Sequence, residues 1–182
     1  MTDKEFFALC QENETVIYER EVTGEIIERS LPGWQTSLRS TSVAVQVGNW
    51  IKQDESGLGF GAFTGFTLPN GAIRGPYFAW VLRSRIWSLV PEQRRGFLPL
   101  CPDFVVELLS DPEELNYFRK KMDEYIACGL RLGWLIDPEE KVVYVYRLGE
   151  PVQKLENANE ISADPELPGF VLDLGEVWEP QL

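Results

Sequence analysis

Residues 102–129 read Pro-Asp-Phe-Val-Val-Glu-Leu-Leu-Ser-Asp-Pro-Glu-Glu-Leu-Asn-Tyr-Phe-Arg-Lys-Lys-Met-Asp-Glu-Tyr-Ile-Ala-Cys-Gly, and this stretch decides the fold. The apolar, β-rich run Phe104–Leu109 is bounded by Pro102 and Ser110, as in a strand that is covered on both faces. Glu107 lies in the middle of that run, where an ionised carboxylate is costly to bury unless a cation or hydrogen-bond donors meet it. We therefore expect a partner for Glu107 nearby.

The residues that follow predict an amphipathic helix. Asp111 suits the N-cap, and Glu114 three residues later completes the sequence pattern of a capping box. Gly129 stands where a left-handed C-terminal cap is expected. The apolar stripe of this helix consists of Leu115, Phe118, Met122 and Ile126. At about 100° per residue, Lys121 falls at the edge of the stripe and could lean over the sheet towards Glu107. The segment by itself fits an ordinary buried ion pair as well as a functional one.

The composition indicates one folded domain over residues 1–182. The chain is long enough for a substantial core, and 44% of its residues are hydrophobic and 12% aromatic. No apolar run approaches the roughly 20 residues that cross a bilayer. The first residues lack the basic and then apolar layout of a signal peptide. We therefore expect a cytoplasmic protein that has no membrane partner.

The sequence contains no histidine. Ser-His-Asp and Cys-His hydrolases and histidine-based zinc sites are therefore excluded. The cysteines Cys10, Cys101 and Cys128 show no Cys-x-x-Cys spacing, which argues against a disulfide framework or a zinc ribbon. Any chemistry must use carboxylates, lysines, tyrosines or a bound metal, and Mg²⁺ or Mn²⁺ suits that set of ligands best.

The net charge of −12 opposes general binding of nucleic acid, because phosphates require local positive charge. The charge is unevenly spread, however. Residues 1–73 carry −5 (10 acids, 5 bases), residues 74–131 carry +1 (8 and 9), and residues 132–182 carry −8 (11 and 3). The middle third contains Glu107 and Lys121. Its arginines, which could face either a phosphate chain or solvent, include Arg83, Arg85, Arg94 and Arg95.

The remaining segments predict helices and strands in mixed order. We expect helices over 2–12, 34–53 and 84–89, a hairpin of 15–20 with 25–30, strands over 58–63, 65–68, 76–82 and 152–155, and a hairpin of 133–137 with 142–147. The glycines at positions 57, 59 and 61 lack the strand and helix context of a nucleotide-binding loop, so we interpret them as part of a twisted strand. This order predicts an α/β fold with a mixed β-sheet flanked by helices.

Six short motifs, in sequence order, resemble the Uma family of restriction-type endonucleases in the PD-(D/E)XK superfamily. They are Gly24-Glu-Ile-Ile, Arg74-Gly-Pro-Tyr77, Val106-Glu-Leu-Leu-Ser110, Lys121-Met-Asp-Glu-Tyr125, Gly133-Trp-Leu-Ile-Asp-Pro138 and Leu167-Pro-Gly-Phe170. None is specific alone, but the similarity covers nearly the whole chain, with the motifs in the right order. The resemblance implies a restriction-endonuclease-like core, Mg²⁺-dependent hydrolysis of phosphodiester bonds and DNA as the partner.

The resemblance also implies roles for single residues. Glu107 matches the metal-binding glutamate, and the backbone carbonyl of Leu108 would be a further ligand of Mg²⁺ or Mn²⁺. Lys121 matches a lysine that has moved from the strand to the following helix, where it would orient water or stabilise charge on the phosphate. The family's metal-binding aspartate is replaced by Tyr77, which is neutral at pH 7 and offers little to Mg²⁺. Asp103 lies roughly 13 Å from Glu107 along a strand that rises about 3.3 Å per residue, too far to replace that aspartate. Asp103 is instead expected to cap the strand entrance.

Three functions are consistent with these observations. The chain is an active endonuclease, or a nuclease-fold module that binds or assembles without cleaving, or a small-molecule-binding α/β protein whose Glu107–Lys121 pair is structural. Exposed aromatic side chains such as Trp87 and Trp178 could serve a homodimer.

Overall fold

The computed structural model describes residues 1–13, 16–62 and 64–180, and its main sheet has six strands in the order β10-β9-β8-β7-β6-β3. These strands are β3 (Gly57–Phe60), β6 (Phe78–Leu82), β7 (Phe104–Leu108), β8 (Leu132–Asp137), β9 (Val142–Arg147) and β10 (Gln153–Glu156). Strands β7 and β8 are parallel, and the other neighbours in the sheet are antiparallel. The predicted mixed sheet is confirmed.

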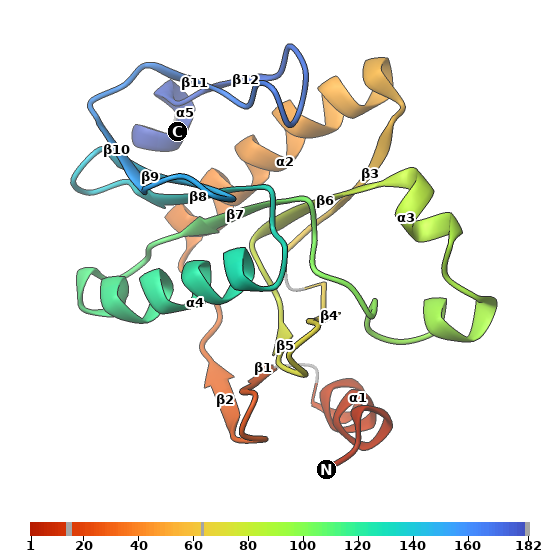
Figure 1. Cartoon of the computed structure of the whole chain (residues 1–182). Coiled ribbons are helices and arrows are strands. Elements are labelled where there is room, and N and C mark those ends of the chain that lie inside the picture. The colour runs from red at the N-terminus through yellow and green to blue at the C-terminus, as the bar shows by residue number, and fades with distance from the viewer. Residues whose placement is uncertain (14–15, 63, 181–182) are drawn as a thin grey trace.

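Helices cover both faces of this sheet (Figure 1). The long helix α2 (Trp34–Asp54) and the short α5 (Gly175–Trp178) lie on one face, and α4 (Leu115–Ala127) lies on the other. Helix α4 is the crossover that joins the parallel strands β7 and β8, as a parallel pair requires. It approaches β8 closely because Gly133 has no side chain: a Cβ there would lie 2.3 Å from Met122 Cε.

A smaller sheet, in the order β2-β1-β5-β4, lies on the same side of the main sheet as α4 (Figure 1). Its strands are β1 (Ile17–Arg20), β2 (Ile26–Arg29), β4 (Phe66–Thr67) and β5 (Ile73–Arg74). The antiparallel pairing of β1 with β2 confirms the predicted hairpin, whose first residue, at position 15, lies outside the described part. Strand β5 was not predicted, since its two residues are too few to give a period. Helix α1 (Asp3–Glu12), predicted over 2–12, begins with a capping box of Thr2 and Glu5.

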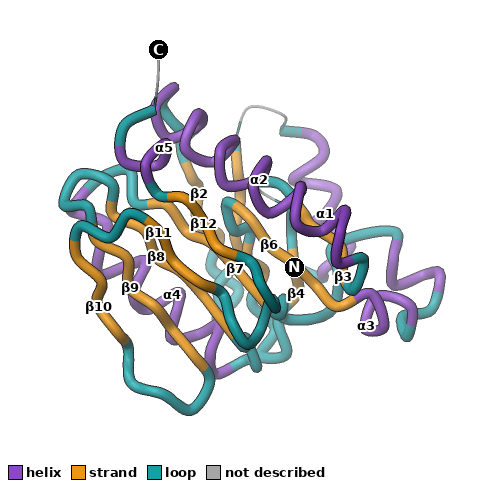
Figure 2. Tube along the Cα trace, turned by 90° about the horizontal axis from the view of Figure 1, so that it is seen from above, coloured by secondary structure: helices purple, strands orange, loops and turns teal. Residues whose placement is uncertain are grey.

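The remaining elements are short. Helix α3 (Arg83–Trp87) follows β6, and the predicted loop over 91–99 contains a 3₁₀ turn, Pro91–Arg94. Strands β11 (Glu160–Ser162) and β12 (Val171–Asp173) pair antiparallel, and Figure 2 shows them beside α2 above the main sheet. Within the described residues, no helix is long and apolar enough to span a membrane.

The two faces of β7 have different surroundings. The Phe104 ring packs edge-on against Trp134 with centroids 4.9 Å apart, and Trp134 stacks on Phe170. Val105 instead lies near Gly133 and Met122, on the α4 side. Because side chains alternate along a strand, Glu107 faces α4 as Val105 does.

One surface expectation is wrong. Trp178 is only 8% exposed, and its indole N–H donates to the Ala158 carbonyl at 2.8 Å, because the C-terminal turn folds back onto the core. Trp87 is 66% exposed, as expected. A dimer surface containing Trp178 is therefore excluded.

Candidate active site

Three buried charges meet between β7, α4 and β1. The Lys121 Nζ lies 2.8 Å from Glu107 Oε1 and 2.6 Å from Glu19 Oε1. Exposure is 1% for Glu107, 4% for Lys121 and 1% for Glu19. The expected contact between Glu107 and Lys121 is present. The Lys121 ammonium group also contacts Glu19, so it bridges two carboxylates.

The start of α4 differs in detail from the predicted cap. Asp111 Oδ1 accepts from the Glu113 N–H at 2.9 Å, as an N-cap should, but Pro112–Glu114 form a 3₁₀ turn before the α-helix. The predicted capping box with Glu114 is wrong, because that carboxylate pairs with Arg29 of β2 at 2.9 Å. Gly129 has a φ of +96° and ends the helix as predicted. These two ends fix the rotation that turns Lys121 inwards.

Sequence reasoning missed Glu19. Its Oε1 also accepts from the Gly75 N–H at 2.8 Å, and its Oε2 accepts from the Tyr117 hydroxyl at 2.9 Å. The Arg74 guanidinium lies 3.7 Å from the same Oε2. The available signal was that Glu19 shares a strand face with Ile17, so that an acid lies on the apolar side of the hairpin.

The two carboxylates differ in acidity. Burial raises the pKa of Glu107, and Lys121 only partly offsets this, so its pKa lies above the ordinary value of 4.5. Burial also acts on Glu19, but Lys121, the Gly75 N–H and Arg74 outweigh it and lower its pKa. Burial disfavours the Lys121 ammonium, yet the two carboxylates raise its pKa overall. Lys121 is therefore protonated at neutral pH and cannot act as a general base there.

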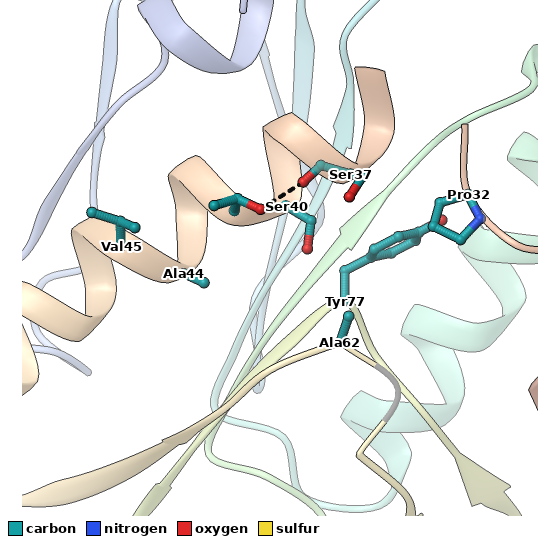
Figure 3. A pocket seen from close by; sticks show the side chains of 8 residues that line it. Pro32, Ser37, Ser40, Ala44, Val45, Ala62 and Tyr77 are labelled. Atoms are coloured by element: carbon teal, nitrogen blue, oxygen red, sulfur yellow. Dashed lines mark hydrogen bonds between the residues drawn. The ribbon is translucent and has the colours of Figure 1, made fainter. Parts of the chain in front are cut away.

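Tyr77 forms part of the wall beside these charges. It is 6% exposed and, with Glu19, Glu107 and Lys121, lines a small cavity of about 10 Å³. Its ring also borders an open pocket of about 380 Å³ beneath α2 and reaches towards Pro32 (Figure 3). Burial and the nearby Glu107 raise the pKa of Tyr77 to about 12. Tyr77 is therefore a neutral phenol where a carboxylate was expected from the resemblance.

Asp103 does not reach this cluster. Its Oδ2 accepts from the Leu82 N–H at 2.9 Å, and its Oδ1 lies 3.0 Å from Arg85 Nη1. Both contacts hold the entrance of β7, as expected from the strand geometry. Asp103 therefore has a structural role.

The four arginines considered as phosphate contacts have different surroundings. Arg83 donates to the Glu55 carbonyl at 3.0 Å, and Arg94 donates to the Leu89 carbonyl at 2.6 Å. Arg85 pairs with Asp103 at the entrance of β7. Within the described residues, only the Arg95 side chain among the four makes no hydrogen bond or ion pair.

The oxygen donors at this site are of the type that a hard cation such as Mg²⁺ prefers, but there are few of them. Glu107 and the Leu108 backbone carbonyl offer the oxygen ligands that Mg²⁺ prefers, although Glu107 Oε1 already accepts from the Tyr125 hydroxyl at 3.3 Å and pairs with Lys121. Both oxygens of Glu19 also accept hydrogen bonds. The described part of the chain has no cluster of three acidic, cysteine or histidine side chains that could hold a metal. Mg²⁺ commonly keeps several waters and needs only one or two carboxylates together with substrate phosphates. An ion at Glu107 would therefore depend on water and substrate for most of its ligands.

Comparison with known proteins agrees with the fold. No curated protein matches the chain. A crystal structure of a "putative nuclease" from Anabaena variabilis ATCC 29413 superposes with a TM-score of 0.74 and 20% identity, covering 88% of this chain and 89% of that one. At that identity the likeness shows a shared fold. The model of the Uma2 family, described as "Putative restriction endonuclease", matches residues 3–175, and the chain therefore belongs to that family.

Proposed function

We propose that the chain is a nuclease that hydrolyses nucleic-acid phosphodiester bonds with Mg²⁺ or Mn²⁺ at Glu107, and that Tyr77 weakens its hold on the metal. The observation that carries this proposal is the Lys121 ammonium, which lies within 2.8 Å of both Glu107 and Glu19 in one cavity. Family membership supports the reaction class. The oxygen donors support the choice of metal.

Each residue has a definite task in this proposal. Glu107 and the Leu108 carbonyl would hold the ion, which when bound would polarise the phosphate and lower the pKa of a bound water. Lys121 keeps its proton and would stabilise negative charge that develops on the phosphate. Glu19 fixes the position of the Lys121 ammonium through its 2.6 Å contact.

One observation favours a second candidate function, a nuclease-fold module that binds without cleaving. The cavity beside Glu107 has about 10 Å³, roughly the room of one water molecule, and Tyr77 forms part of its wall. A hydrated ion and a phosphate would need this wall to move. For a small-molecule-binding protein, the third possibility, the open pocket of about 380 Å³ beside Tyr77 offers space but no charged group of the Glu107 cluster.

Nicking of supercoiled plasmid in Mg²⁺ and Mn²⁺ tests the proposal. Tyr77→Asp is expected to raise the nicking rate about 10- to 100-fold, because it adds a metal ligand, and Tyr77→Phe should leave the rate unchanged. Adding Glu107→Gln to Tyr77→Asp should abolish the gain. If neither the wild type nor Tyr77→Asp nicks DNA at millimolar Mn²⁺, the non-cleaving module is the better description.

A homodimer is part of the proposal as well, since two copies would present two cleavage sites. Helix α2 carries an exposed apolar stripe made of Trp34 (59% exposed), Leu38 (41%) and Val45 (54%). These positions are spaced four and seven residues apart and so share one face of the helix. In a chain of net charge −12, an uncharged stripe is where two copies meet with least repulsion.

A further inference from the structure

A separate pocket lies between α1 and the segment 92–99. Its volume is about 690 Å³, within the range of roughly 300–1,000 Å³ that is typical of ligand sites. Phe7 and Phe97 line it together with Lys4 and Arg95. This set differs from the cluster around Glu107, with which it shares no residue.

The aromatic wall of this pocket is held in place. The Phe97 ring packs edge-on against Phe7, with centroids 5.0 Å apart. Gly65 lies directly against Phe97, because a Cβ on Gly65 would be only 2.0 Å from the ring. Next to it, the Leu98 N–H donates to the Gly65 carbonyl at 3.2 Å. An aromatic ligand would therefore meet a preformed surface and lose little free energy to ordering.

The unpaired charged side chains that line the pocket carry a net positive charge. Within the described residues, the side chains of Lys4 and Arg95 make no hydrogen bond or ion pair. Of the two acids in the wall, Asp3 is paired with Arg20 at 2.5 Å, which leaves Glu92. Two unpaired cations thus face one unpaired acid, in a chain whose net charge is −12.

We propose that this pocket binds a nucleotide, with the base against Phe7 and Phe97 and the phosphate on Arg95 and Lys4. Aromatic side chains accept every base by stacking, and a guanidinium can hold a phosphate with two hydrogen bonds. The nucleotide is either free or one unit of a single strand. The site uses neither Glu107 nor a metal, so it does not depend on the nuclease proposal.

The test is fluorescence anisotropy with a labelled single-stranded oligodeoxynucleotide, at low salt and in EDTA so that no cleavage occurs. The double variant Lys4→Glu with Arg95→Glu should raise the Kd about tenfold or more and reduce the salt slope by about 0.7 for each phosphate that the variant no longer neutralises. Phe7→Ala should also raise the Kd, by about fivefold or more because it removes a stacking surface, with thermal unfolding measured to verify its fold. The matched control is Lys52→Glu with Lys120→Glu, which makes the same change in net charge at exposed positions outside the pocket.

Competition identifies the form of the nucleotide. Displacement of the oligonucleotide by AMP, but not by inorganic phosphate, would assign the site to free nucleotides; displacement only by unlabelled oligonucleotide would assign it to a strand. The proposal is overturned if neither the labelled oligonucleotide nor AMP binds. It is also overturned if Lys52→Glu with Lys120→Glu weakens binding as much as Lys4→Glu with Arg95→Glu. An absence of plasmid nicking would count against the nuclease proposal and leave this result unaffected.

Discussion

At Lys121, the electrostatic balance is between one ammonium and two carboxylates. The Nζ lies 2.6 Å from Glu19 and 2.8 Å from Glu107, and all three side chains are nearly inaccessible. Burial of a charge is costly unless opposite charge compensates it, so both carboxylates depend on the one ammonium. The ammonium is therefore both the proposed catalytic charge and a contributor to the stability of the fold.

Replacing Lys121 with methionine should lower the free energy of unfolding at pH 7 by about 3–5 kcal/mol, because two buried carboxylates lose their counter-charge. The loss should shrink towards pH 5, where Glu107 takes up a proton more readily. Urea unfolding at both pH values measures this. Lys120→Met is the control, because Lys120 is exposed, and equal losses in the two variants would contradict the argument.

The opposite pKa shifts of the two acids give opposite pH effects. The pKa of Glu107 is raised above 4.5, so the folded state binds more protons there, and stability falls as pH rises through the folded pKa. Glu107→Gln should remove that fall and be at least as stable as the wild type at pH 7.

The pKa of Glu19 is lowered, so its contribution to stability is present above pH 4.5 and is lost as pH falls through the folded pKa. Glu19→Gln should therefore be less stable at pH 7, with the difference narrowing in acid. Urea titrations from pH 3 to pH 7 check both signs.

At the scale of elements, the glycines of β3 allow this strand to pack closely against neighbouring side chains. A Cβ on Gly57 would lie 2.2 Å from the Trp80 indole, and one on Gly59 would lie 2.7 Å from Ile51 Cδ1. Strand β3 pairs with β6 at Gly57–Leu82 and Gly59–Trp80, so Trp80 comes from the neighbouring strand, and Ile51 comes from α2. The interpretation of these glycines as strand residues is confirmed for positions 57 and 59, and close packing is the reason for them.

Gly57→Ala should lower the free energy of unfolding by about 1–3 kcal/mol, because the rigid indole of Trp80 cannot move aside without straining the core. Gly61→Ala, where a Cβ would meet nothing within 4 Å, should change it by less than about 0.5 kcal/mol. Thermal or urea unfolding of the pair provides the measurement. A larger cost at position 61 than at position 57 would overturn this packing argument.

At the scale of the molecule, the two sides of the main sheet have different tasks. Figure 1 shows α4 and the small sheet on one side of the main sheet and α2 on the other. The first side holds the buried charges, and α2 carries the exposed stripe of Trp34, Leu38 and Val45. A dimer through α2 would leave the α4 side open to substrate.

Light scattering after size exclusion should give twice the monomer mass of 20.8 kDa, and Val45→Glu should return the monomer. Thr41→Glu on the same face is a second probe, and Lys120→Glu, at an exposed position of α4 on the other side of the sheet, is the control. A monomeric wild type would remove the dimer from the proposal.

The sequence by itself determined the main sheet, its principal helices and the contact between Glu107 and Lys121. These features depend on local periods, and a strand followed directly by a crossover helix places their side chains on the same face. The family resemblance was also contained in short motifs, each of which is continuous in the sequence. Strand β5 and the burial of Trp178 could not be predicted in this way, because neither is marked by a local period in the sequence.

Only the tertiary structure decided that Glu19 joins the pair. It is 88 residues from Glu107 and 102 from Lys121 along the chain, and no period of the hairpin says which surface the hairpin covers. The docking of the small sheet against α4 brings this carboxylate to the ammonium and places Tyr77 in the wall beside it. Long-range burial assigns partners to charges, whereas sequence patterns only show which charges will need them.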